Sequence, residues 1–118
     1  MKARILLVVF AMFLSFASAA PAYAAPALAP TTMKTSWYKS PWSNGVAHRK
    51  LPKGTILRIE NPKTGAYTWG VVNDRGPYIK GRDLDVSAEI AEILGITGAG
   101  VARLKVSIVY RPPKKGRG

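Results

Sequence analysis

The sequence predicts a small, mainly β barrel with one short helix. Several short runs alternate apolar and polar residues, as strands with one buried face do. Turns rich in Gly and Pro separate these runs. Only one segment has the apolar spacing of a helix. Five or six short strands with a single helix favour a closed barrel over a layered fold.

Four strands can be located from local pattern. In the second, Leu57 and Ile59 share one face, while Arg58 and Glu60 share the other. In the last and clearest, Ala102, Leu104, Val106 and Ile108 alternate with polar residues. The four expected strands cover residues 35–38, 55–60, 66–73 and 102–108.

The single helix is expected directly after Ser87, which is a good N-cap residue. Glu89 falls in the first turn, where the helix dipole favours an acid, and Gly95 is a C-terminal stop. The expected buried stripe, at i, i+3 and i+4, consists of Ile90, Ile93 and Leu94.

Composition excludes several kinds of chemistry. The 118-residue chain has no cysteine, so disulfides, thiolate metal sites, cysteine nucleophiles and acylation at an N-terminal cysteine are excluded. One histidine and six scattered carboxylates make a metal cage unfavourable, and we expect neither metal nor cofactor. The formal net charge of +12 favours polyanionic surroundings: nucleic acid, anionic lipid or an acidic wall polymer.

Residues 1–24 have the pattern of a secretory signal peptide. Lys2 and Arg4 precede an apolar stretch, and the small residues Ala22 and Ala24 mark a cleavage site after Ala24. The alternative is an uncleaved anchor, but the apolar stretch is shorter than the ~20 residues that a membrane span needs. We therefore expect a secreted, periplasmic or cell-wall-associated protein, with no stable membrane span after cleavage and no nucleic-acid partner.

The rest of the chain divides into three parts. Residues 25–33 form an Ala/Pro linker, residues 34–110 form the barrel domain, and residues 111–118 form a basic tail that we expect to be disordered. We also expect the protein to be a monomer.

A carboxylate stands where an expected strand ends. Asp74 follows the run Tyr67–Val72 and precedes Gly76-Pro77, a pair that fixes a turn. A fixed carboxylate at the lip of a β structure is a candidate site residue. The alternative is an aspartate that caps the turn and pairs with Arg75, whose charge also favours the ionised carboxylate.

Four motifs in order indicate a known family: Ser36-Trp37-Tyr38, Ala47–Thr55 (AHRKLPKGT), Asn73–Tyr78 (NDRGPY) and Arg82–Ser87 (RDLDVS). Together they resemble the RlpA (rare lipoprotein A) family over residues 34–108. That resemblance implies a six-stranded double-psi β-barrel, related in fold to expansins and barwin. It also implies peptidoglycan as the target, and lytic cleavage between N-acetylmuramic acid and N-acetylglucosamine on strands stripped of peptides.

The resemblance also assigns site residues. Asp74 matches the family's groove aspartate and His48 matches the histidine of its Ala-His-x-x-Leu-Pro-x-Gly-Thr segment, so both are candidate catalytic residues. His48 is either a proton carrier or sugar ligand, or a hydrogen-bonded histidine that braces the barrel. The candidate substrate-binding residues are Tyr38, Trp42, Arg75 and Asp85. Of the three tryptophans, Trp42 is the best candidate for an exposed sugar platform, and at least one other is expected in the core.

One departure from the family bears on catalysis. The family carries a glutamate soon after an Asn-Gly pair, whereas the segment 39–46 contains no acid. If Asn44-Gly45 is aligned with that pair, the glutamate position falls on Val46. If it is not, the glutamate position is deleted from this chain. One carboxyl group can still serve a lytic transglycosylase, by protonating the leaving oxygen and then deprotonating the sugar's 6-hydroxyl.

Three functions from different classes are therefore open. The first is a reduced lytic transglycosylase that uses Asp74 with support from His48. The second is a non-catalytic, expansin-like module that binds peptidoglycan or another anionic wall polysaccharide. The third is a secreted cationic protein that acts on membranes or nucleic acid through charge alone; the tail fits it, but the ordered barrel motifs do not.

Overall fold

The computed structural model describes residues 29–114. The expected signal peptide (1–24), the first part of the linker (25–28) and the end of the basic tail (115–118) lie outside the described residues. The elements are β1 (Thr31–Tyr38), β2 (Gly45–Ala47), β3 (Ile56–Glu60), β4 (Tyr67–Asp74), β5 (Leu84–Ser87), α1 (Ala88–Leu94) and β6 (Val101–Tyr110).

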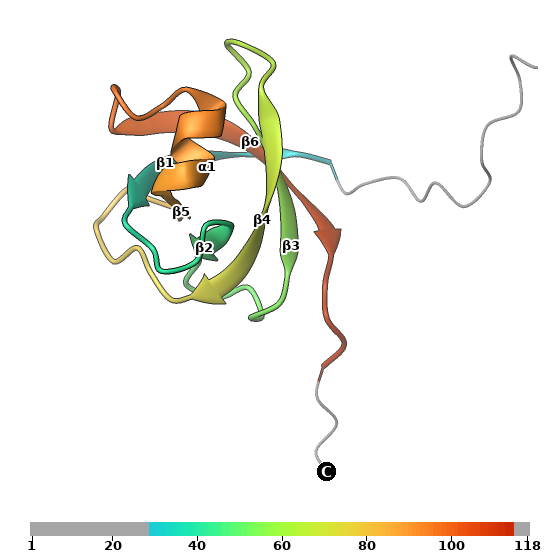
Figure 1. Cartoon of the computed structure of the whole chain (residues 1–118). Coiled ribbons are helices and arrows are strands. Elements are labelled where there is room, and N and C mark those ends of the chain that lie inside the picture. The colour runs from blue at the N-terminus through green and yellow to red at the C-terminus, as the bar shows by residue number, and fades with distance from the viewer. Residues whose placement is uncertain (1–28, 115–118) are drawn as a thin grey trace, which may run out of the picture.

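The six strands form one closed barrel in the order β1-β5-β2-β4-β3-β6, and β6 pairs with β1 to close it (Figure 1). The pairs β1–β5 and β2–β4 are parallel, and the other four are antiparallel. This confirms the prediction of a mainly β, six-stranded barrel with one short helix.

Two strands were not located by local pattern. β2 has three residues, all buried between its neighbours β4 and β5, and β5 has four. The first strand is also longer than expected. It begins at Thr31, so residues 31–33, which were assigned to the linker, pair with Leu104, Lys105 and Val106 of β6.

The core consists of the inward-facing side chains of the strands and the side chains on one face of the helix. Leu57 and Ile59 are fully buried, as their alternation predicted. Helix α1 packs against β4, β5 and β1 (Figure 1). The remaining fully buried side chains of the barrel include Val46, Val72, Leu84, Val86 and Leu104.

The helix has the predicted ends but a different buried face. The Ser87 side chain accepts a hydrogen bond from the Ile90 N–H at 3.1 Å, and Gly95 ends the helix in the left-handed conformation with φ of 70°. Ile93 is 55% exposed, so the prediction that it is buried was wrong. The buried stripe consists of Ile90, Ala91 and Leu94, because so short a helix presents only a narrow face to the barrel.

Candidate functional site

A row of paired residues crosses four strands next to the end of β4. Ser36 pairs with Asp85, Asp85 with Ala47, and Ala47 with Asp74. Asp74 therefore lies two strands from Asp85, roughly 10 Å away at the backbone by strand spacing. Register thus brings two of the predicted site residues into one neighbourhood, although they come from different motifs.

Asp74 is exposed and accepts two hydrogen bonds. The Tyr38 hydroxyl donates to Oδ2 at 3.3 Å, and the Arg75 backbone N–H donates to Oδ1 at 2.8 Å. Burial raises the pKa of Tyr38 above 10.0, and the charges of Asp74 and Asp85 raise it further, against a hydrogen bond from Ser40. The phenol therefore keeps its proton at neutral pH and remains a donor to Asp74.

Asp74 caps the turn through the Arg75 backbone N–H, but the Arg75 side chain does not pair with it, so only the ion-pair part of the turn-capping alternative was wrong. Arg75 Nη1 instead donates to the backbone carbonyls of His48 at 3.1 Å and Leu51 at 2.7 Å. Within residues 29–114, no guanidinium nitrogen of Arg75 lies within 4.0 Å of a carboxylate. The guanidinium serves here as a clamp, because its fork of donors can satisfy two turn carbonyls together.

His48 follows β2 directly and is half-buried. Its Nδ1 accepts hydrogen bonds from the backbone N–H groups of Lys50 and Leu51, both at 3.0 Å. The backbone N–H of His48 donates to the backbone carbonyl of Asp74 at 3.2 Å. Burial, followed by the charges of Arg49 and Arg75, lowers the pKa of His48 below its ordinary 6.5.

The ring of His48 is therefore neutral at pH 7, with its proton on Nε2. This geometry favours the bracing role over that of a proton carrier, since Nδ1 is already occupied. The Nε2–H group has no hydrogen-bond acceptor among the described residues. It is a donor that a sugar hydroxyl can use.

Arg49 is a supporting residue that the sequence did not single out. Its Nη1 donates to the carbonyls of Pro77 at 2.8 Å and Arg82 at 2.5 Å, and Nη2 lies 3.8 Å from Asp83 Oδ1. These contacts fix both ends of the segment 77–83 that follows Asp74 and exposes Tyr78. The family segment has a variable position here, so no local pattern separated Arg49 from the many other cations.

The other predicted binding residues are placed as follows. Trp42 is 59% exposed in the turn between β1 and β2, as expected for a platform. Trp37 is partly buried against the core. Trp69, 52% exposed on β4, is a second exposed tryptophan that the sequence did not single out. Asp85 is half-buried, and its Oδ1 accepts a hydrogen bond from the Ser36 hydroxyl at 2.7 Å.

Two further findings concern metal binding and membrane spanning by the described residues. In residues 29–114, no three His, Cys, Asp or Glu side chains are grouped closely enough to hold a metal ion. Among residues 29–114, no helix has both the length and the apolar character that crossing a membrane requires.

Known proteins resemble this chain in sequence and in fold. A family model described as "Lytic transglycolase" matches residues 31–106. A probable endolytic peptidoglycan transglycosylase RlpA of Nostoc sp. is 39% identical over 72 residues, which are 61% of this chain and 19% of that protein. The corresponding protein of Aquifex aeolicus is 43% identical over 63 residues, covering 53% of this chain and 28% of the relative.

An endolytic peptidoglycan transglycosylase RlpA of Vibrio cholerae is 32% identical over 90 residues, which cover 64% of this chain and 34% of the relative. The chain thus spans between about a fifth and a third of the length of these relatives. The solved structure of the Streptomyces papain inhibitor has a TM-score of 0.58 and 16% identity over 72% of this chain and 98% of that one, and shows the fold alone. The chain belongs to the lytic transglycolase family of RlpA-like double-psi β-barrels.

Proposed function

We propose that this barrel acts on the glycan strands of peptidoglycan, as a monomer outside the cytoplasm, and cleaves them as a lytic transglycosylase. The observation that carries the proposal is the exposed Asp74 carboxylate, held by the Tyr38 hydroxyl and the Arg75 N–H. The names of the relatives, which are endolytic peptidoglycan transglycosylases, support the same substrate.

The chemistry needs one carboxyl group that works twice. Protonated Asp74 gives its proton to the glycosidic oxygen as the bond from C1 of the muramic sugar to that oxygen breaks. The carboxylate then takes the proton of the same sugar's 6-hydroxyl, whose oxygen bonds to C1 and closes a 1,6-anhydro ring. No water is consumed, and Asp74 ends the cycle protonated, as it began.

The neighbouring groups have supporting roles in this proposal. Tyr38 and Arg75 orient the carboxylate between its two tasks. His48 donates from Nε2 to a sugar hydroxyl, and Trp42 gives an exposed flat surface for a sugar ring. Asp85, bonded to Ser36, lies on the same row and can accept a hydrogen bond from the sugar through its second oxygen.

A specific observation favours a second candidate, the non-catalytic glycan-binding module. Val46, onto which alignment of Asn44-Gly45 places the family glutamate, is 0% exposed and packs in the core. A glutamate at this position of the barrel would not reach the face with Asp74. The segment 39–44 between β1 and β2 also carries no acid that could replace it.

A digestion assay separates the two candidates. The chain, its Asp74→Asn variant and a Glu89→Gln control are mixed with peptide-stripped glycan strands, and anhydro-muramic ends are read by mass. Products from the native chain and the control, but not from Asp74→Asn, are expected for the enzyme. Absence of products with intact glycan pull-down supports the binding module, and absence of both rejects peptidoglycan as the target.

A further inference from the structure

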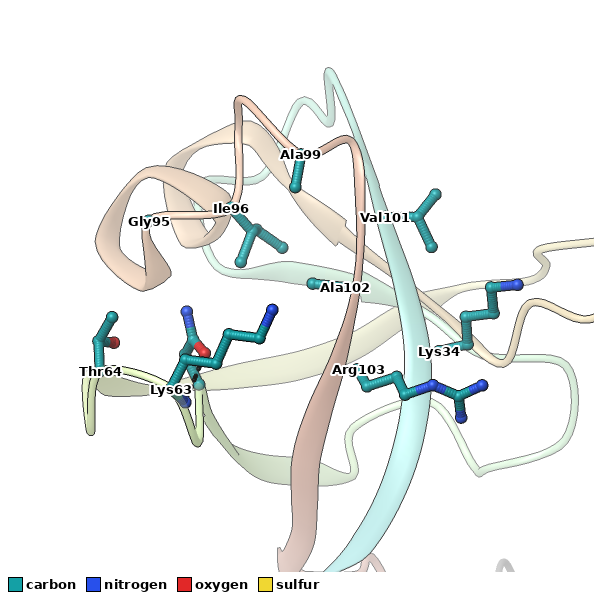
Figure 2. A pocket seen from close by; sticks show the side chains of 10 residues that line it. Lys34, Lys63, Thr64, Gly95, Ile96, Ala99, Val101, Ala102 and Arg103 are labelled. Carbon is teal, nitrogen blue, oxygen red and sulfur yellow. Dashed lines mark hydrogen bonds between the residues drawn. The ribbon is translucent and has the colours of Figure 1, made fainter.

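A cavity of about 590 Å³ lies apart from Asp74. It is bordered by the β3–β4 loop, the turn after α1 and the neighbouring strands β1 and β6 (Figure 2). The β3–β4 loop precedes Tyr67, whereas Asp74 ends the same strand, about 23 Å away along an eight-residue strand. The cavity is therefore a separate feature and not part of the Asp74 site.

Three cationic side chains line this cavity: Lys34 from β1, Lys63 from the β3–β4 loop and Arg103 from β6. Figure 2 shows Lys63 entering from the loop, while Lys34 and Arg103 extend from the two adjacent strands. All three are exposed. Among residues 29–114, the ion pairs are Arg49–Asp83 and Arg58–Glu60, so these three cations have no carboxylate within 4.0 Å.

Lys34 and Arg103 face each other directly in the antiparallel register. Like charges at opposed positions destabilise a sheet, since the side chains of such a pair extend from the same face a few ångströms apart. Asp83, the acid bonded to Lys34, does not relieve this, because its Oδ2 accepts from the Lys34 backbone N–H and its Oδ1 faces Arg49. An anion placed between the two cations would remove the repulsion.

The other walls of the cavity are apolar and small. Ile96, Ala99, Val101 and Ala102 line it beside the polar side chains of Asn61 and Thr64. Asn61 is committed elsewhere, since its Nδ2 donates to the Leu94 carbonyl and its Oδ1 accepts from the Lys63 N–H. A cavity of this volume is far larger than a simple ion, and it combines cations with surfaces that suit the C–H face of a sugar ring.

We propose that this cavity is a second glycan subsite, which binds a sugar bearing a free carboxylate through Lys34, Lys63 and Arg103. This inference rests on the proposed function, because the muramic sugar of a glycan strand bears such a carboxylate. The group is charged only when no peptide is joined to it, since the peptide is attached there as a neutral amide. The subsite would thus distinguish stripped strands from peptide-bearing strands by charge.

One strand of the barrel connects the subsite to the Asp74 face. Lys34 and Tyr38 both lie on β1, four residues apart, which is about 13 Å in an extended strand. Alternation places them on the same side of β1. A glycan of several sugars is long enough to span this distance.

Binding of two chemically matched ligands tests this subsite. Peptide-stripped glycan strands are used as prepared, or after conversion of their carboxylates to neutral amides, and affinities are measured by calorimetry at low and moderate salt. All proteins carry Asp74→Asn so that the strands stay intact. The variants are the triple change Lys34→Gln, Lys63→Gln, Arg103→Gln, the charge-preserving Arg103→Lys, and the control Lys53→Gln, which removes one exposed cation outside the cavity.

We expect the triple variant to bind acidic strands about tenfold more weakly at low salt, and neutral strands unchanged. Arg103→Lys should keep most of the affinity, and Lys53→Gln should change it less than about twofold. Equal affinity for acidic and neutral strands would reject the subsite and leave the proposed function standing. Binding of neither kind of strand would reject the proposed function itself.

Two other outcomes also contradict the subsite. If Lys53→Gln weakens binding as much as the triple variant does, net charge and not the cavity attracts the strand. If the triple variant loses binding to phosphatidylglycerol vesicles but not to acidic strands, the three cations bind a membrane anion.

Discussion

The Tyr38 hydroxyl and the Asp74 carboxylate are joined by a hydrogen bond of 3.3 Å, although 36 positions separate the two residues in the chain. Tyr38 ends β1 and Asp74 ends β4, which are not neighbouring strands of the barrel. The contact therefore crosses β5 and β2 and depends on closure of the whole barrel. Since the pKa of Tyr38 is raised, the phenol keeps its proton at neutral pH and remains a donor to Asp74.

Replacement of Tyr38 by phenylalanine tests this contact. The change removes the donor to Asp74 but keeps the ring, so the carboxylate loses one of its two positioning bonds. We expect release of anhydro-muramic ends to fall about tenfold, the usual effect of losing one hydrogen bond to a charged group. Product formation is measured by mass, and thermal unfolding is followed in parallel.

Tyr110→Phe is the matched control, because it removes an exposed hydroxyl at the end of β6, a strand that does not pair with β4. Its activity should equal that of the native chain. A Tyr38→Phe variant with full activity and unchanged unfolding would show that the hydrogen bond to Asp74 does not contribute to catalysis.

The sequence predicted those strands and the helix whose residues have a clear local pattern. The strand around Leu57 and Ile59 alternates strictly, and the helix has both of its caps in sequence. β2 could not be recognised in this way, since three buried residues have no alternation. Its strand geometry is imposed by pairing with β4 on one side and β5 on the other.

The candidate site divides along the same line. Motif order predicted Asp74 and His48 as site residues, and the parallel β2–β4 pair brings their backbones into hydrogen-bond contact. The direction of the Arg75 side chain could not be predicted, because the two carbonyls that it binds belong to a turn more than twenty residues earlier. Asp74 is adjacent to Arg75 in sequence, but the Arg75 guanidinium binds these carbonyls instead of the Asp74 carboxylate.

Stability should depend on the protonation of His48. Its folded pKa lies below 6.5, so the unfolded chain takes up this proton at a higher pH than the folded chain does. The resulting stabilisation is fully present above pH 6.5 and is lost as the pH falls from 6.5 through the folded pKa. Protonation also removes the acceptor for the N–H groups of Lys50 and Leu51.

A His48→Asn variant isolates this effect, because its side-chain oxygen can accept the same backbone bonds but does not titrate. The free energy of unfolding is measured by denaturant titration from about pH 7.5 to about pH 5. We expect the native chain to lose stability more steeply than the variant on acidification. Parallel curves would mean that His48 has the same pKa in both states.

The buried position of Val46 leads to a prediction about the missing glutamate. Val46→Glu would place a carboxyl group in a core formed with Val72 and Val86, its register partners. We expect destabilisation of at least about 3 kcal/mol and no gain of cleavage, since the new group has no partner there. Val46→Ala, which only deletes apolar atoms, should cost less, about 1–3 kcal/mol. A stable Val46→Glu variant with increased cleavage would show that this position reaches the substrate.

Gly70 marks tight packing of β4 against both β2 and the helix. It is buried in β4 opposite Leu57, and an added Cβ would collide with Val46 Cγ2 and lie 3.1 Å from Ile90 Cδ1. We expect Gly70→Ala to destabilise the fold by about 1–3 kcal/mol, because the core must shift to admit one methyl group. Gly98→Ala is the matched control, since nothing lies within 4 Å of its added Cβ. Denaturant unfolding of the two variants checks the difference, and equal stability would mean that the Val46 and Ile90 side chains can move aside without cost.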